Sequence, residues 1–79
     1  MHIEKLIKMA NQIGAFFEAM PDRTQAMKDI ASHIQRTWDP AMRATLLAHL
    51  DTQAEADIGL KPIVDEAVRS HRKALEAPT

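Results

Sequence analysis

Four histidines are the side chains in this sequence best suited to acid–base or metal chemistry: His2, His33, His49 and His71. No two of them are four residues apart, the spacing that places two imidazoles on one helical face around a metal ion. Cysteine is absent, which excludes thiolate ligands and disulfides. We therefore predict no metal site in this chain.

Two carboxylates suggest catalysis but have simpler interpretations. Asp29 and His33 share a helical face, a spacing at which a carboxylate can orient a general base. No nucleophile accompanies them, because Ser32 and Ser70 each stand isolated, so we favour a surface hydrogen bond or ion pair. Asp39 precedes a proline, and this order is typical of a helix N-cap. We predict no catalytic residue.

Trp38 and Arg43 flank that cap and are candidates for binding. An indole can stack on a ligand or a nucleobase. The spacing of Trp38 from Ile34 and Ala31 favours a place in the core or at an interface instead. Arg43 lies one turn after the cap, where it either pairs with a carboxylate of a partner protein or is a solvated helix residue. Both alternatives remain open for Arg43.

Length and charge exclude several function classes. The 79 residues form one domain, 1–79, with a net charge of −1, so no strong field for nucleic acid is expected. The only glycines are Gly14 and Gly59, which excludes a glycine-rich phosphate loop. A chain this short and without disulfides is marginally stable alone, and burial against a partner would stabilise it.

The N-terminal residues predict neither secretion nor membrane insertion. Glu4, Lys5 and Lys8 interrupt the apolar residues there, unlike a signal peptide. No apolar run reaches the length of a transmembrane helix. We expect a cytoplasmic protein with no membrane partner.

The hydrophobic periodicity predicts an all-α fold of about four helices, at residues 3–20, 22–37, 40–50 and 62–76. Prolines set three of the boundaries, and Asp22 with Gln25 forms a capping-box pattern at the second helix. The polar stretch 51–57 is either a loop or further helical turns, closed by Gly59. His71 lies on the apolar stripe of the last helix, which favours a half-buried imidazole over a ligand.

The first predicted helix is apolar over about half of its circumference, more than one neighbouring helix covers. Met9, Phe16 and Met20 widen its apolar side, and we predict that they form a docking surface. Gly14 lies on the same side, either because another helix approaches closely or as a tolerated accident. The full set of predicted partner-binding residues is Met9, Ile13, Phe16, Phe17, Met20, Trp38 and Arg43.

Several short motifs together resemble a known family. They are Met9-Ala10-Asn11-Gln12-Ile13 with Phe16-Phe17, then His33-Ile34 and Trp38-Asp39-Pro40 with Met42-Arg43, then Leu46-Leu47-Ala48-His49, and finally Gly59-Leu60, Pro62 and Glu66-Ala67-Val68. From about Met9 to Val68 the chain resembles the delta subunit of soluble, NAD-dependent molybdenum formate dehydrogenases of bacteria. It departs from that pattern at Lys61, where a helix-capping side chain is expected, and in the acidic stretch 51–57.

The resemblance implies a non-catalytic accessory subunit that docks on the enzyme complex and stabilises it or helps to assemble it. It further implies a large alpha subunit carrying the molybdenum cofactor and iron–sulfur clusters, and beta and gamma subunits carrying FMN and further clusters. No cofactor is expected in the delta subunit. The alternative is a free-standing helical module that forms a homo-oligomer through the same apolar surface.

Overall fold

The computed structural model describes residues 2–52 and 59–76, and every regular element within these ranges is an α-helix. The predicted all-α fold is confirmed. The five helices are α1 (Ile3–Phe17), α2 (Arg23–Thr37), α3 (Pro40–Thr52), α4 (Pro62–Ser70) and α5 (Arg72–Glu76). Of the polar stretch 51–57, residues 51 and 52 continue α3, and the rest lies outside the described residues.

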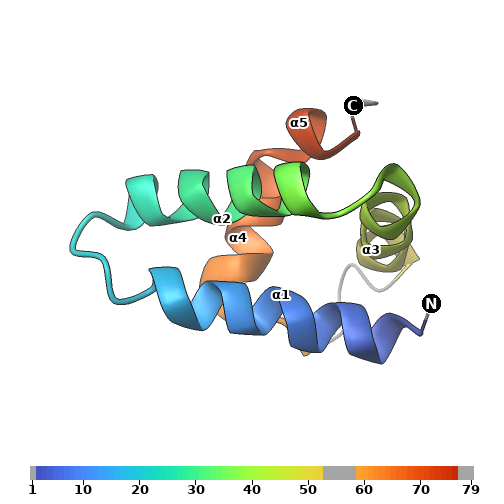
Figure 1. Ribbon diagram of the computed structural model, residues 1–79, viewed down its shortest axis with the longest axis horizontal. Coiled ribbons are helices and arrows are strands. Elements are labelled where there is room, and N and C mark those ends of the chain that lie inside the picture. Colours follow the sequence, from blue (N-terminus) through green and yellow to red (C-terminus); the bar gives the residue numbers. More distant parts are fainter. Residues whose placement is uncertain (1, 53–58, 77–79) are drawn as a thin grey trace.

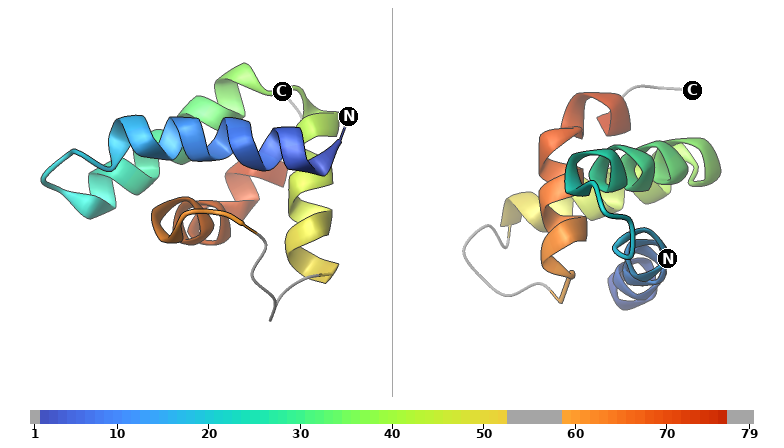
Figure 2. Two further views of the ribbon diagram at one scale, coloured as in Figure 1. Left: turned by 90° about the horizontal axis from the view of Figure 1, so that it is seen from below. Right: turned by 90° about the vertical axis from the view of Figure 1, so that its left-hand side faces the viewer.

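The first two helices form an antiparallel hairpin (Figure 1). Helix α4 crosses behind this hairpin and packs against both of its helices, and α3 packs across the end of α1 that is remote from the turn. Helix α5 packs on α2 and α3 (Figure 2). One face of the α1–α2 hairpin therefore covers the core, and the other faces outward.

Two aspartates begin helices as predicted. The Asp22 carboxylate accepts a hydrogen bond from the Gln25 backbone N–H at 3.2 Å, and Asp39 accepts one from the Met42 N–H at 2.8 Å. The reciprocal half of the predicted capping box is not formed, because the Gln25 side-chain amide donates to Asp29 at 2.9 Å instead. Asp39 thus has the structural role expected of an Asp-Pro pair.

Two predicted helices differ from those of the structure. Helix α1 ends at Phe17 rather than at residue 20, because Pro21 disfavours helical geometry in the residue before it. The end of the third helix, which the sequence left open, lies at Thr52. The segment 62–76 is two helices, because His71 caps α4 outside helical geometry (φ −112°, ψ 28°) and the chain then re-forms a helical turn.

The start of α4 is held by a side chain from α1. Lys61 occupies the N-cap position and makes no side-chain capping bond, as expected for a residue that cannot accept one. The Asn11 amide donates to the Gly59 carbonyl at 2.8 Å and accepts from the Lys61 N–H at 2.9 Å. The Lys61 ammonium in turn contacts the Glu18 carboxylate at 3.1 Å. Residues of α1 thereby position the segment that leads into α4.

The core lies between the hairpin and the three later helices. Helix α1 contributes Leu6, Ala10 and Gly14, which repeat every four residues and so lie on one face. A Cβ atom built on Gly14 would overlap the Cγ2 atom of Val64. The close approach of another helix, one of the two explanations for this glycine, is therefore the correct one. The buried apolar side chains include Ile30, Ile34, Trp38, Leu46, Leu50, Val64, Val68 and Leu75.

Candidate partner-binding groove

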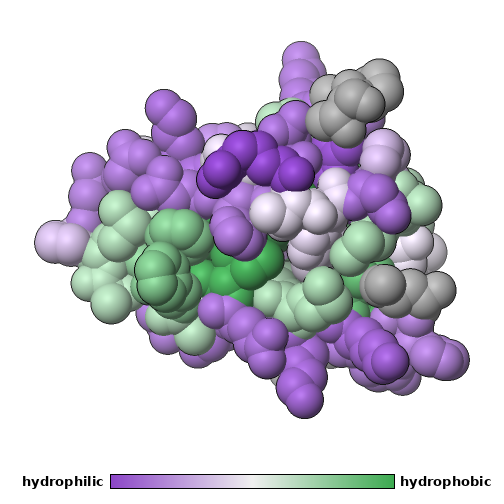
Figure 3. Space-filling view, viewed as in Figure 1, coloured by the Kyte–Doolittle hydropathy of each residue, from purple (hydrophilic) through white to green (hydrophobic). Residues whose placement is uncertain are grey.

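An open apolar groove runs along the outward face of the α1–α2 hairpin and has a volume of about 520 Å³. We call it the α1–α2 groove. Its lining comes from α1 (Met9, Gln12, Ile13, Phe16 and Phe17), from α2 (His33 and Thr37) and from the corner that follows (Trp38 and Met42). Figure 3 shows this face as a green apolar band between two purple polar margins.

Phe16 is the large apolar side chain that the described residues leave in solvent, with 76% of its surface exposed. Its ring lies edge-on to that of Phe17, with 5.0 Å between the centroids. Phe17 is half-buried, and its ring centroid lies 6.2 Å from that of His33 across the groove. The Phe16 ring therefore projects into solvent, whereas the Phe17 ring packs between Phe16 and His33 in the wall of the groove.

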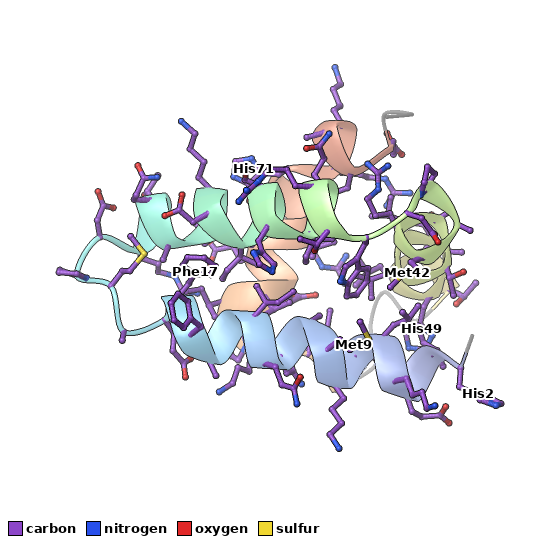
Figure 4. The ribbon with its side chains drawn as sticks, in the orientation of Figure 1. His2, Met9, Phe17, Met42, His49 and His71 are labelled. Atoms are coloured by element: carbon purple, nitrogen blue, oxygen red, sulfur yellow. The ribbon has the colours of Figure 1, made fainter. Side chains whose placement is uncertain are left out.

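The two ends of the groove are built differently. Phe17 lies at the end near the turn between α1 and α2, whereas Met9 and Met42 lie at the end formed by α3 (Figure 4). Both methionines are half-buried. Unbranched thioether side chains adapt their shape to different neighbours, as at many interfaces. The groove thus has a fixed aromatic end and an adaptable end.

Few polar groups line the groove. The Thr37 hydroxyl donates to the His33 carbonyl within α2 at 2.7 Å, so it is already engaged. The Gln12 side chain is exposed and the His33 side chain is half-buried. These three side chains give the groove some hydrogen-bonding capacity, but its surface is predominantly apolar.

The predicted partner-binding residues divide into three groups. Met9, Ile13, Phe16 and Phe17 all line the groove, and Trp38 lines it while being only 4% exposed. Met20 is half-buried in the turn, packs against the core and does not line the groove. Of the predicted docking surface of Met9, Phe16 and Met20, only Met9 and Phe16 lie together in the groove.

Arg43 lies inside the protein rather than on its surface. It is 1% exposed and shares the buried face of α3 with Leu46, Leu47 and Leu50. The interpretation of Arg43 as a solvated helix residue is wrong. Contact between its guanidinium and a partner carboxylate remains a prediction, but it would need the surrounding helices to separate.

Sequence reasoning missed four residues of the groove: Gln12, His33, Thr37 and Met42. His33 and Thr37 lie beside the narrow apolar stripe of α2, and nothing in their spacing distinguishes a groove wall from a solvated face. Met42 follows Trp38 by four residues across a helix boundary, where helical periodicity does not apply. These residues are identified only by the packing of different helices against one another, which the sequence alone does not reveal.

The strongest electrostatic arrangement lies away from the groove. The Arg72 guanidinium donates two hydrogen bonds to the Asp51 carboxylate, at 2.7 and 2.8 Å, and a third to Glu76 at 2.9 Å. The hydrogen bonds from Arg72 hold the pKa of Asp51 below its usual value, and the bonds to Asp51 and Glu76 raise the pKa of Arg72. This arrangement joins α3 to α5 and is structural.

The groups suited to chemistry do not converge. Asp29 accepts from Gln25 rather than engaging His33, which instead faces Phe17. His71 lies far from His2 and His49 (Figure 4). Within residues 2–52 and 59–76, no three His, Asp or Glu side chains gather in a way that would hold a metal ion. None of the helices in these ranges has the length and apolar character needed to cross a membrane.

The fold and the groove place the chain among small all-helical proteins with an open apolar surface groove. Residues 5–68, most of the chain, match the family model of the NADH-dependent formate dehydrogenase delta subunit, FdsD. The chain belongs to this family. Comparisons with curated proteins and with solved structures give no match.

Proposed function

We propose that this chain is a non-catalytic accessory subunit that docks on a bacterial, cytoplasmic formate dehydrogenase and stabilises or helps to assemble it. Membership of the delta-subunit family supports formate dehydrogenase as the partner complex. The α1–α2 groove is the surface through which we propose that the chain docks. The large alpha subunit and its beta and gamma companions are the proposed partners. The molybdenum cofactor, the iron–sulfur clusters and FMN are assigned to those subunits.

The exposure of Phe16 is the observation that carries this proposal. A phenylalanine that is 76% exposed beside an apolar groove leaves a large apolar area in water. Aromatic side chains that fill pockets supply much of the free energy of binding at protein interfaces. Docking on a partner would remove the Phe16 ring and the groove from water together.

The test compares two carboxylates introduced one residue apart. Phe16→Asp should weaken binding to the remaining formate dehydrogenase subunits by about 30-fold or more, the effect of losing an aromatic hot spot of about 2 kcal/mol. Ala15 is exposed, does not line the groove and lies about 100° away around the same helix, so Ala15→Asp should leave binding nearly unchanged. Co-purification and a titration of tagged chain with the co-expressed subunits measure both.

Both variants should keep their helical circular dichroism, because each site is exposed. Each variant places a carboxylate near the C-terminal end of α1, where the helix dipole disfavours negative charge. The small loss of stability that results is the same in both variants and cancels in the comparison. Equal binding by the two variants would show that the groove is not the docking surface. Self-association of the isolated chain that Phe16→Asp abolishes, without any binding to the enzyme, would favour a homo-oligomer instead.

A further inference from the structure

Resting on the proposed function, we infer that the α1–α2 groove holds one amphipathic helix of a partner subunit, with an apolar stripe flanked by carboxylates. The apolar stripe would lie against Ile13, Phe16 and Met42, and the carboxylates would face Lys5 and Arg36. The backbone, the length of the groove and its charged margins each support this choice of occupant.

The groove offers a partner almost no backbone hydrogen bonds. Its two long walls are α-helices, whose N–H and C=O groups are already bonded within each helix. An extended peptide would bury its own backbone polar groups against Met9, Ile13 and Phe17 without partners, which is costly. A helix bonds its backbone internally and presents only side chains, which is how amphipathic helices bind apolar grooves.

The length of the groove fits two to three helical turns. On α1 its lining runs from Met9 to Phe17, which spans about 12 Å at the helical rise of 1.5 Å per residue. Apolar side chains at positions i, i+4 and i+7 of a partner helix span about 10 Å. Figure 3 shows the apolar band as elongated along the hairpin rather than round. One helix lying along the seam matches this shape.

The margins of the groove carry cations that have no acidic partner among the described residues. Lys5 precedes Met9 by four residues, Gln12 by seven and Phe16 by eleven, so it lies on the groove side of α1. On α2, Arg36 follows His33, which lines the groove, by three residues and so lies beside it on the helix surface. The ion pairs of residues 2–52 and 59–76 involve neither cation.

Most acidic side chains of the described ranges are, by contrast, already engaged. Glu18, Asp51, Asp65, Glu66 and Glu76 are in ion pairs. Asp29, the acidic residue nearest the groove on α2, accepts a hydrogen bond from the neutral Gln25 amide and keeps its negative charge. The groove margins therefore carry two cations without an acidic partner in the described ranges, Lys5 and Arg36, against this one carboxylate, so their net charge is positive. Carboxylates on the flanks of the partner helix would complement it.

A charge-reversal pair tests the flanks. The double variant Lys5→Glu/Arg36→Glu should bind the co-expressed formate dehydrogenase subunits about tenfold more weakly at 50 mM NaCl, and the difference should shrink at 300 mM because salt screens exposed charges. Lys28→Glu/Lys73→Glu is the matched control, because it makes the same change in net charge at exposed cations away from the groove margins. Lys28 lies about 140° around α2 from His33, and Lys73 lies on α5. Equal weakening by both doubles, or by neither, would overturn the assignment of acidic flanks.

A photocrosslinker identifies the occupant itself. Phe16 is replaced by p-benzoylphenylalanine, the assembled enzyme is irradiated, and the attached peptide is identified by mass spectrometry. We expect a partner-subunit helix with apolar residues at i, i+4 and i+7 and with Asp or Glu beside them. A crosslink to a non-helical segment, to a second copy of this chain, or to nothing in an assembled enzyme would overturn the inference. Failure of the wild-type chain to bind the enzyme would instead refute the proposed function.

Discussion

Gly14 shows how one missing side chain sets the distance between two helices. It lies in the last turn of α1, where glycine is a poorer helix former than alanine by up to about 1 kcal/mol. That cost is offset because α4 approaches so closely that a Cβ atom would overlap Val64. Val64 is fully buried and branched at Cβ, so its side chain has little freedom to move aside.

Gly14→Ala should therefore destabilise the protein, although alanine is the better helix former. Overpacking a core costs about 1–3 kcal/mol and outweighs the gain in helix propensity, so we expect a net loss on the order of 1 kcal/mol in urea unfolding. The double variant Gly14→Ala/Val64→Ala should lose less than the sum of the two single variants, because the smaller side chain makes room. A more stable Gly14→Ala variant would mean that α4 does not pack against this glycine.

Asn11 marks the limit of residue-level prediction. Its place in an Asn-Gln-Ile motif pointed to a family, but not to its bonds with Gly59 and Lys61, 48 and 50 residues away. Such contacts leave no periodic pattern in the sequence. The absence of a capping side chain at Lys61 was predictable, whereas the structure that replaces it, an amide from α1, was not.

At the scale of elements, α3 and α5 are joined by the paired hydrogen bonds between Asp51 and Arg72. The division of the last helix at His71 turns α5 so that Leu75 is buried and Arg72 reaches α3. Periodicity alone predicted one helix over 62–76, because Leu75 continues the same apolar stripe. The position of the break depends on what α5 packs against, and this is again a contact between distant residues.

The Asp51–Arg72 pair makes a prediction about pH. The pKa of Asp51 is lowered in the folded protein, so the pair stabilises the fold fully above the ordinary aspartate pKa of about 3.9. That stabilisation is lost as the pH falls from there through the folded-state pKa. Wild-type protein should therefore be more stable than Asp51→Asn at pH 7, and the difference between them should shrink as the pH falls below about 3.9.

Urea midpoints at pH 7, 5, 3.5 and 2.5 measure this convergence. The matched comparison uses Arg72→Met, in which the further change Asp51→Asn should have little effect at any of these pH values. A difference between wild type and Asp51→Asn that persists unchanged to pH 2.5 would show that the carboxylate charge is not the source of the stabilisation.

At the scale of the whole molecule, the chain covers most of its own core. Its Cα radius of gyration is 11.4 Å, close to the value of about 12 Å expected for a compact domain of 79 residues. The sequence predicted the all-α class and all four of its helix starts within one residue. Three of these starts are set by proline and aspartate signals, which act locally. It also predicted that α1 has more apolar surface than one neighbour covers.

The groove itself was only partly predictable. Met9, Ile13, Phe16 and Phe17 lie on one helix, so their periodicity was enough to group them. The opposite wall depends on how α2 and α3 are placed, and therefore on packing that no single helix encodes. The error on Arg43 has the same origin: its charge suggested a surface position, whereas the helices around it enclose the side chain.

The most direct test of docking through the groove is hydroxyl-radical footprinting of the chain, alone and within the assembled formate dehydrogenase. Oxidation of Phe16 should fall at least fivefold on assembly, because its exposed ring would pass from solvent into an interface, and oxidation of the half-buried Met9 should also fall. Oxidation of His71, which does not line the groove, should change little and serves as the internal reference. Unchanged oxidation of Phe16 in the assembled enzyme would show that the α1–α2 groove is not the docking surface.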